Sequence, residues 1–204
     1  MEGIMWKKLS AVFAVLLAVT LTGCGSSNNG PTVFTTQITS SATVDGYIVN
    51  GTPPFLGTAS VFAGIDPIGG ATETRAFLDF DLTSLPPNAA IDFAALRLYI
   101  NSIQPGGASV PIRIELVEFP PPLITSDFNT PAIGTAVVLD TIRPIDLGIN
   151  GGYIDIPVTP LVRTAWSRGN FFQVRIMEDL GPVLPGIIEI NETNFPPKLR
   201  VDFF

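Results

Sequence analysis

The sequence predicts an all-β protein, an antiparallel β-sandwich that follows an export signal. Three observations support this prediction. Apolar and polar residues alternate along many short segments, as they do in strands with one buried and one solvated face. Breaks rich in Pro and Gly separate these segments at regular intervals. Nineteen Gly and nineteen Pro among 204 residues are also too many for a fold of long helices.

The N-terminal segment has the features of a bacterial lipoprotein signal peptide. Lys7 and Lys8 give it a positively charged start, and residues 9–22 form an apolar run of 14 residues. A helix of this length is shorter than the hydrocarbon core of a bilayer, about 30 Å, so the run predicts a cleaved signal. The sequence Leu-Thr-Gly-Cys at residues 21–24 resembles a lipobox, which implies a diacylglycerol on the thiol of Cys24.

An ordinary secretory peptide with a chance cysteine is the alternative. Cys24 favours lipidation because it is the only cysteine and directly follows the apolar run. Each buried CH₂ of an acyl chain contributes about 0.8 kcal/mol to membrane binding, so two or three chains hold firmly. Gly at position 25 resembles lipoproteins of the Gram-negative outer membrane. We therefore expect a signal peptide at 1–23, a flexible tether at 24–31 and a single β-sandwich domain at 32–204.

The charge of the predicted mature chain excludes some partners. Nine basic and seventeen acidic side chains remain after residue 23, which gives a net charge of −8. An acidic surface repels phosphate backbones, so nucleic acid is not an expected partner. It also repels anionic lipid headgroups, so attachment to the membrane is expected through the lipid on Cys24.

Alternation is clearest in four segments, and we expect each to be a strand with one face in the core. They are residues 96–100, 112–116, 172–176 and 199–203. About nine or ten strands at this spacing favour a sandwich over alternating strands and helices.

One short helix is predicted near residues 159–166 (TPLVRTAW). Thr159 is a candidate N-cap, and Pro160 suits the first helical position. At one-turn spacing, Leu161, Ala165 and Trp166 would then face the core.

Three parts of the chain carry a pattern of a known family: residues 42–50 (ATVDGYIVN), residues 74–100 (TRAFLDFDLTSLPPNAAIDFAALRLYI), and residues 156–166 together with 196–203. In order and spacing they resemble the DNRLRE-type domains and the related family-96 carbohydrate-binding modules. The resemblance implies an exported sandwich of jelly-roll type that binds carbohydrate. Residues 118–141 depart from the family pattern, because they contain none of the tryptophans that are usual there.

The composition argues against an enzyme. The chain has no histidine and its single cysteine is the predicted lipid attachment site, which excludes Ser-His-Asp triads, cysteine nucleophiles and histidine-ligated metals. Asp79 and Asp81 point to the same side of a predicted strand and are the remaining carboxylate pair. A solvated strand face that bears Arg75, Phe77, Asp79 and Asp81 explains them without catalysis.

Candidate ligand contacts are Tyr47, Arg75, Phe77 and Tyr99, because exposed aromatic rings beside charged groups suit the binding of sugars. Edge packing and hydrogen bonding are the alternative roles of the two tyrosines.

A structural Ca²⁺ is implied by the resemblance to jelly-roll modules, and its candidate ligands are Asp45 and Glu192. These two residues flank the first and last predicted strands, which often meet in a sandwich. Asp45 as a turn-capping residue is the alternative, and no other cofactor is expected.

The leading functional hypothesis is a non-catalytic surface or periplasmic lipoprotein that binds or organises extracellular carbohydrate. Its binding activity is implied by the resemblance, since a fold alone does not determine function. A structural or adhesion module that binds another protein is the alternative, and a polysaccharide-active enzyme is the weaker one.

Overall fold

The computed structural model describes residues 30–68, 72–179 and 184–204. The predicted signal peptide, Cys24 and nearly all of the tether lie outside these residues. No helix within the described part of the chain is long and apolar enough to cross a membrane.

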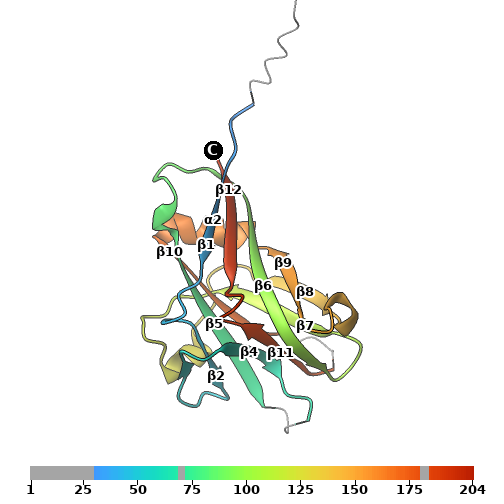
Figure 1. Ribbon diagram of the computed structural model, residues 1–204. Helices are drawn as coiled ribbons and strands as arrows, with labels where there is room; N and C mark the ends of the chain where they lie inside the picture. The colour runs from blue at the N-terminus through green and yellow to red at the C-terminus, as the bar shows by residue number, and fades with distance from the viewer. Residues whose placement is uncertain (1–29, 69–71, 180–183) are drawn as a thin grey trace, which may run out of the picture. The chain divides into compact units, whose positions relative to one another are not determined.

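The domain from Val33 to Phe204 is built of antiparallel strands, which confirms the all-β prediction (Figure 1). In chain order the described strands are β1 (Phe34–Thr39), β2 (Gly46–Val49), β3 (Phe55–Leu56), β4 (Ser60–Ile65), β5 (Glu73–Asp81), β6 (Ile91–Pro105), β7 (Val110–Leu116), β8 (Val137–Ile142), β9 (Gly152–Pro157), β10 (Phe171–Glu178), β11 (Gly186–Asn191) and β12 (Lys198–Phe203). One α-helix, α2 (Thr159–Arg168), and three 3₁₀ turns, η1 (Leu82–Ser84), η2 (Thr125–Asn129) and η3 (Pro144–Asp146), lie between them.

The strands pair in one continuous sheet, which the short pairing of β4 with β5 divides into two parts that we call the first and the second sheet. In the first sheet β6 lies between β9 on one side and β12 and β11 on the other, with β1 beside β12 and β4 beside β11. The second sheet has the order β2-β5-β10-β7-β8. Among the described residues, two pairs join β4 to β5, Gly64 with Thr74 and Ile65 with Glu73. The main core takes side chains from both sheets, and this makes the fold a sandwich.

In the first sheet, the alternation of apolar and polar residues correctly predicts which side chains are buried. Leu96, Leu98 and Ile100 of β6 are fully buried in the main core. Arg97 between them is exposed and Tyr99 is half-buried. This sheet has one face in the core and one face in water, as expected of an antiparallel sandwich.

The outer face of the second sheet is buried, contrary to the prediction. Arg175 and Gln173 of β10, Glu115 of β7 and Asp79 of β5 are all less than a tenth exposed. Phe77, expected on a solvated face, is fully buried. Successive residues do point to opposite faces of the second sheet, but a further segment of the chain covers its outer face.

The connection between β7 and β8 supplies that further layer. Its residues Val117, Phe119 and Phe128 pack with Ile48 and Phe77 in a second, smaller core. The rings of Phe77 and Phe119 make an edge-to-face contact, with centroids 5.6 Å apart. Burial of Phe77 therefore follows from contacts with residues about forty positions away in sequence, which a local pattern does not report.

Helix α2 confirms the single predicted helix. Pro160 lies in its first turn, Leu161 and Ala165 are buried, and Trp166 packs against the main core. The predicted cap is wrong, because the N-cap residue is Val158. The Thr159 hydroxyl instead accepts a hydrogen bond from the backbone N–H of Ala94 in β6, at 2.9 Å. The helix contacts β6 of one sheet and β10 and β7 of the other.

Candidate functional site

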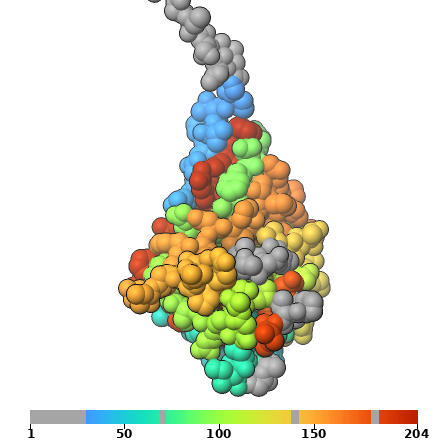
Figure 2. Space-filling model, turned by 90° about the vertical axis from the view of Figure 1, so that its right-hand side faces the viewer, coloured from blue at the N-terminus to red at the C-terminus, as the bar shows by residue number. Residues whose placement is uncertain are grey.

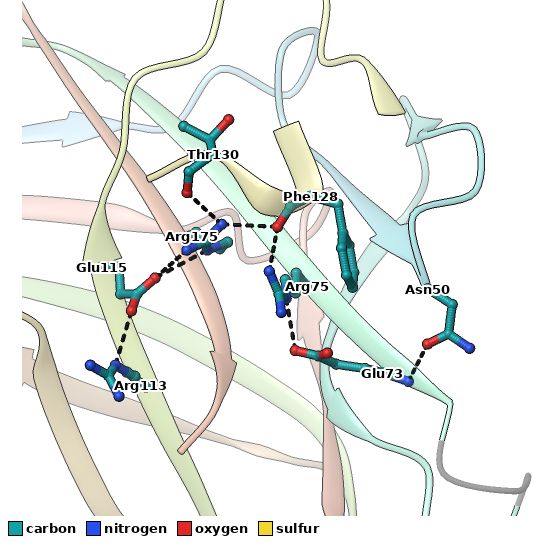
Figure 3. Close-up of polar contacts among 8 residues, drawn as sticks. All are labelled: Asn50, Glu73, Arg75, Arg113, Glu115, Phe128, Thr130 and Arg175. Atoms are coloured by element: carbon teal, nitrogen blue, oxygen red, sulfur yellow. Dashed lines mark hydrogen bonds and ion pairs between the residues drawn. The ribbon is translucent and has the colours of Figure 1, made fainter. Parts of the chain in front are cut away.

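The buried Arg175 and the mostly buried Arg75 hold the connection between β7 and β8, which we call the covering connection, against the second sheet (Figure 3). Arg175 donates hydrogen bonds to the backbone carbonyls of Phe128 and Thr130, each at 2.9 Å. Arg75 donates to the same Phe128 carbonyl. Glu115 compensates the charge of Arg175 through a buried ion pair. We call these residues the arginine clamp.

The clamp is extended on both sides. Glu115 forms a second ion pair with Arg113, at 3.0 Å. Arg75 forms an ion pair with Glu73 at 2.7 Å, and its guanidinium carbon lies 4.0 Å from the centre of the Phe128 ring. A guanidinium stacked on an aromatic face gains a cation–π attraction. Each clamp arginine thus has both an acidic partner and a loop contact.

These contacts correct two of the predicted ligand contacts. The Arg75 side chain is only 12% exposed and is already engaged with Glu73 and Phe128. Phe77 is fully buried in the second core. Both residues therefore stabilise the fold, since neither presents a free surface to a ligand.

Tyr47 and Tyr99 lie in different sheets and do not form one surface. Tyr47 is half-buried on β2, where it stacks on Phe55 with centroids 4.8 Å apart and meets the edge of Phe62. Burial raises the pKa of the Tyr47 hydroxyl above its usual value. Tyr99 lies on β6, where it has other aromatic neighbours.

Three rings gather on the outer face of the first sheet, and we call them the aromatic surface. Tyr99 stacks on Phe195 with centroids 4.3 Å apart, and it meets the edge of Tyr153 at 5.0 Å. Tyr153 is 52% exposed and Phe195 is 41% exposed. Exposed aromatic area of this kind is available to a ligand.

Backbone pairing and a side-chain cap position these rings. Tyr99 and Tyr153 are direct partners in the ladder between β6 and β9. Phe195 lies in the turn after β11, where the Asn191 side-chain oxygen accepts hydrogen bonds from the backbone N–H groups of Thr193, Asn194 and Phe195. Sequence reasoning missed Phe195, because its position depends on this Asn-capped turn.

Polar groups border the aromatic surface. Arg97 and Asp155 form a two-point ion pair, both contacts at 2.7 Å, and both side chains are about half exposed. The Arg97 guanidinium lies 5.5 Å from the centre of the Tyr153 ring. The Tyr99 hydroxyl donates to the Asn150 carbonyl at 2.7 Å. The surface thus combines ring faces with hydrogen-bonding groups.

The loop between β8 and β9 adjoins the aromatic surface through that Asn150 contact. It lies on the molecular face seen in Figure 2, where its colour is between yellow and orange. Ile145 and Ile149 of this loop are exposed to solvent almost completely. Exposed apolar side chains beside exposed rings enlarge the area on which a ligand or partner gains by desolvation.

Asp45 and Glu192, the predicted cation ligands, are brought together inside the domain. Asp45 precedes β2 and Glu192 follows β11, and they are 2% and 4% exposed. Asp45 Oδ1 accepts a hydrogen bond from the backbone N–H of Asp79, at 2.8 Å. Asp45 Oδ2, both Glu192 carboxylate oxygens and the nearby Ser40 Oγ are buried without a hydrogen-bond partner among the described residues. We call this group the acidic pair.

Burial strongly affects the ionisation of this pair. Burial raises the pKa of Asp45 to about 7, against the opposing effect of the Asp79 hydrogen bond. Burial, together with the neighbouring Asp45 carboxylate, raises the pKa of Glu192 to about 9. Two carboxylates this close do not both carry charge without compensation. Either a retained proton or a bound cation supplies it.

The oxygens of the acidic pair suit a hard cation such as Ca²⁺, which binds carboxylates, hydroxyls, carbonyls and water. Within the described ranges, no group of three or more His, Cys, Asp or Glu side chains converges. The remaining ligands of a cation held by Asp45 and Glu192 would therefore be neutral oxygens, for which Ser40 is well placed.

Asp79 and Asp81, the carboxylate pair considered for catalysis, lie in different environments. Asp79 is 6% exposed, and burial raises the pKa of its carboxyl group. Asp81 is exposed and caps the turn η1 by accepting from the backbone N–H of Thr83 at 2.9 Å. The prediction that both are solvated is therefore correct for Asp81 and wrong for Asp79.

Comparison with known proteins adds no family to this description. A scan against models of protein families finds no match, and a search of curated protein sequences finds no significant similarity.

The arginine clamp makes a prediction for stability. Arg175→Met leaves Glu115 buried with only the half-exposed Arg113, and leaves the Thr130 carbonyl without its donor, so the free energy of unfolding should fall by about 3–5 kcal/mol. Arg143→Met removes an exposed ion pair with Asp146 and should leave the free energy of unfolding almost unchanged, because solvent screens such pairs. Urea denaturation of both variants measures the two free energies of unfolding. Equal decreases would show that the clamp contributes no more to stability than an exposed ion pair does.

The acidic pair makes a prediction for pH. Its two pKa values are raised on folding, so the folded chain binds more protons than the unfolded chain above the ordinary carboxyl pKa of about 4. With EDTA present, stability should be highest at acidic pH and should fall as pH rises through about 7 and about 9. Thermal melts across this range test it. Asp45→Asn combined with Glu192→Gln should flatten the slope, and an unchanged slope would contradict this origin.

Proposed function

We propose that the protein is an exported, lipid-anchored lipoprotein whose β-sandwich binds extracellular carbohydrate without catalysis. The observation that carries the proposal is the aromatic surface of Tyr99, Tyr153 and Phe195 on the outer face of the first sheet.

The chemistry of the aromatic surface suits a sugar chain. Pyranose rings have apolar C–H faces that pack on aromatic rings and hydroxyl groups that need polar partners. Tyr153 and Phe195 offer exposed ring area, while Arg97 and Asp155 beside them are half exposed and retain hydrogen-bonding capacity. Because Tyr99 and Tyr153 are held by a strand ladder, little conformational entropy is lost on binding.

Charge favours neutral over acidic polysaccharides. The predicted mature chain carries a net charge of −8, which repels polyanions over about 10 Å at moderate ionic strength. Arg97, whose guanidinium lies 5.5 Å from the centre of the Tyr153 ring, is already paired with Asp155. We therefore infer a neutral glycan as the ligand class.

The anchor is proposed on the lipobox and Cys24. Cys24→Ser in the full-length chain should abolish incorporation of radiolabelled palmitate and move the protein from the membrane fraction to the soluble fraction, because no acyl chain then enters the bilayer. Ser27→Ala in the tether is the matched control and should change neither result. Palmitate labelling that survives Cys24→Ser would rule out this attachment site.

Binding should depend on the exposed rings. Tyr153→Ala and Phe195→Ala should each weaken binding to a neutral glycan by about tenfold, equivalent to about 1.4 kcal/mol, through the loss of stacking area. Phe55→Ala removes an exposed ring from another part of the domain and should leave affinity unchanged. A glycan array followed by calorimetric titration of the full-length chain measures this. No binding to any glycan, with co-purification of one protein partner, would favour the protein-binding alternative.

We also propose that Asp45 and Glu192 hold a structural Ca²⁺, supported by their buried, unpartnered oxygens. The positive charge of the ion would allow both carboxylates to ionise at neutral pH. Repeating the pH series with Ca²⁺ in place of EDTA should remove the loss of stability that otherwise runs from about pH 4 to about pH 9. Superimposable melts with Ca²⁺ and with EDTA would leave the retained proton as the compensation.

A further inference from the structure

A cavity of about 660 Å³ lies where the C-terminal end of α2 meets the start of β10 and the covering connection after β7. Its volume is within the range of about 300–1,000 Å³ typical of small-molecule sites. It belongs to the second sheet, so it is separate from the aromatic surface on the first sheet. No role proposed above uses it.

The cavity is lined by apolar side chains, which we call its walls, and by two polar residues of the strands, Asp79 and Gln173, which we call its base. Phe119, Phe171 and Leu116 contribute apolar surface, and the Phe171 ring is 56% exposed. Asp79 and Gln173 line it from β5 and β10. Asp79 is only 6% exposed, and its Oδ1 has no hydrogen-bond partner among the described residues. A buried acceptor without a partner is costly unless a ligand satisfies it.

Gln173 fixes the shape of this base. Its side-chain oxygen accepts a hydrogen bond from the backbone N–H of Phe119, at 2.9 Å. Gln173 and Asp79 are direct partners in the ladder between β10 and β5. The side chain of Gln173 thus links the wall at Phe119 to the base. Asp79 Oδ1 remains available to accept a hydrogen bond from a ligand.

The electrostatics of the cavity favour a cation. The helix α2 ends there, at Ala165, Arg168 and Gly169, and the C-terminal end of a helix carries partial negative charge. Arg168 lies at the rim, but Glu118 pairs with it at 3.3 Å. The carboxylate of Asp79 and the C-terminal end of α2 therefore both attract a positively charged ligand.

We propose that this cavity binds an organic ammonium ion with an apolar body, its N–H groups directed at Asp79 Oδ1 and its body between Phe119 and Phe171. Aromatic faces attract ammonium groups and also pack against apolar groups, so Phe119 and Phe171 can contact both the charged end and the apolar body of such a ligand. A sugar would leave many hydroxyl groups facing the apolar walls without partners. The site is thus independent of the carbohydrate proposal.

Three probes of one shape test the charge preference on the full-length chain by calorimetric titration. 2-Phenylethylamine is a cation at neutral pH, 2-phenylethanol is neutral and 3-phenylpropanoate is an anion. The amine should bind at least about tenfold more tightly than the alcohol, which corresponds to about 1.4 kcal/mol, and the anion should bind most weakly. Equal affinities for the amine and the alcohol, or no binding of the amine, would overturn the proposal.

Variants locate the binding. Asp79→Asn should reduce affinity for the amine to that for the alcohol while leaving the alcohol unchanged. Asp81→Asn removes the charge of the exposed acid two residues along the same strand, which acts on Asp79 only from a distance, so it should change affinity for the amine far less than Asp79→Asn does. Phe171→Ala removes a mostly exposed ring, which the fold tolerates, and should weaken amine binding at least about threefold. Full amine affinity in either Asp79→Asn or Phe171→Ala would place the amine elsewhere.

Discussion

The carbonyl of Phe128, held by the guanidinium groups of Arg175 and Arg75, is the contact on which the second sheet depends. It keeps the connection after β7 against the sheet, and so creates the second core around Phe77. The same connection provides Phe119 to the cavity. A buried Arg–Glu pair contributes little net stability because desolvation opposes it. Its main effect is to define where the connection lies.

Local patterns predicted the fold where neighbours in sequence decide burial. β6 alternates as expected, and α2 begins with Pro160 in its first turn. The same reasoning placed Phe77 and Arg75 on a solvated face and was wrong, because the covering layer comes from a distant segment. Alternation identifies which residues share a face of a strand, but whether water or protein covers that face is a tertiary property.

The candidate sites were predictable to different degrees. Tyr99 was identified by its outward position, but Tyr153 becomes its partner only through the pairing of β9 with β6. Asp45 and Glu192 were expected to approach each other from the ends of the domain, and the structure places them side by side. The cavity at Asp79 had no sequence signal, because helix α2, β10 and the covering connection each supply part of it.

The pairing of β1 with β12 has a consequence for the order of folding. Thr35 donates to Asp202 across a separation of 167 residues, and Phe34 pairs with Phe203. The first strand therefore has no place in the sheet until the last strand has been synthesised. Contacts of such long range form slowly, because a long loop must close first. A chain of this topology stays incompletely folded until its synthesis is complete, and the proposed export through a translocation channel would require such a state.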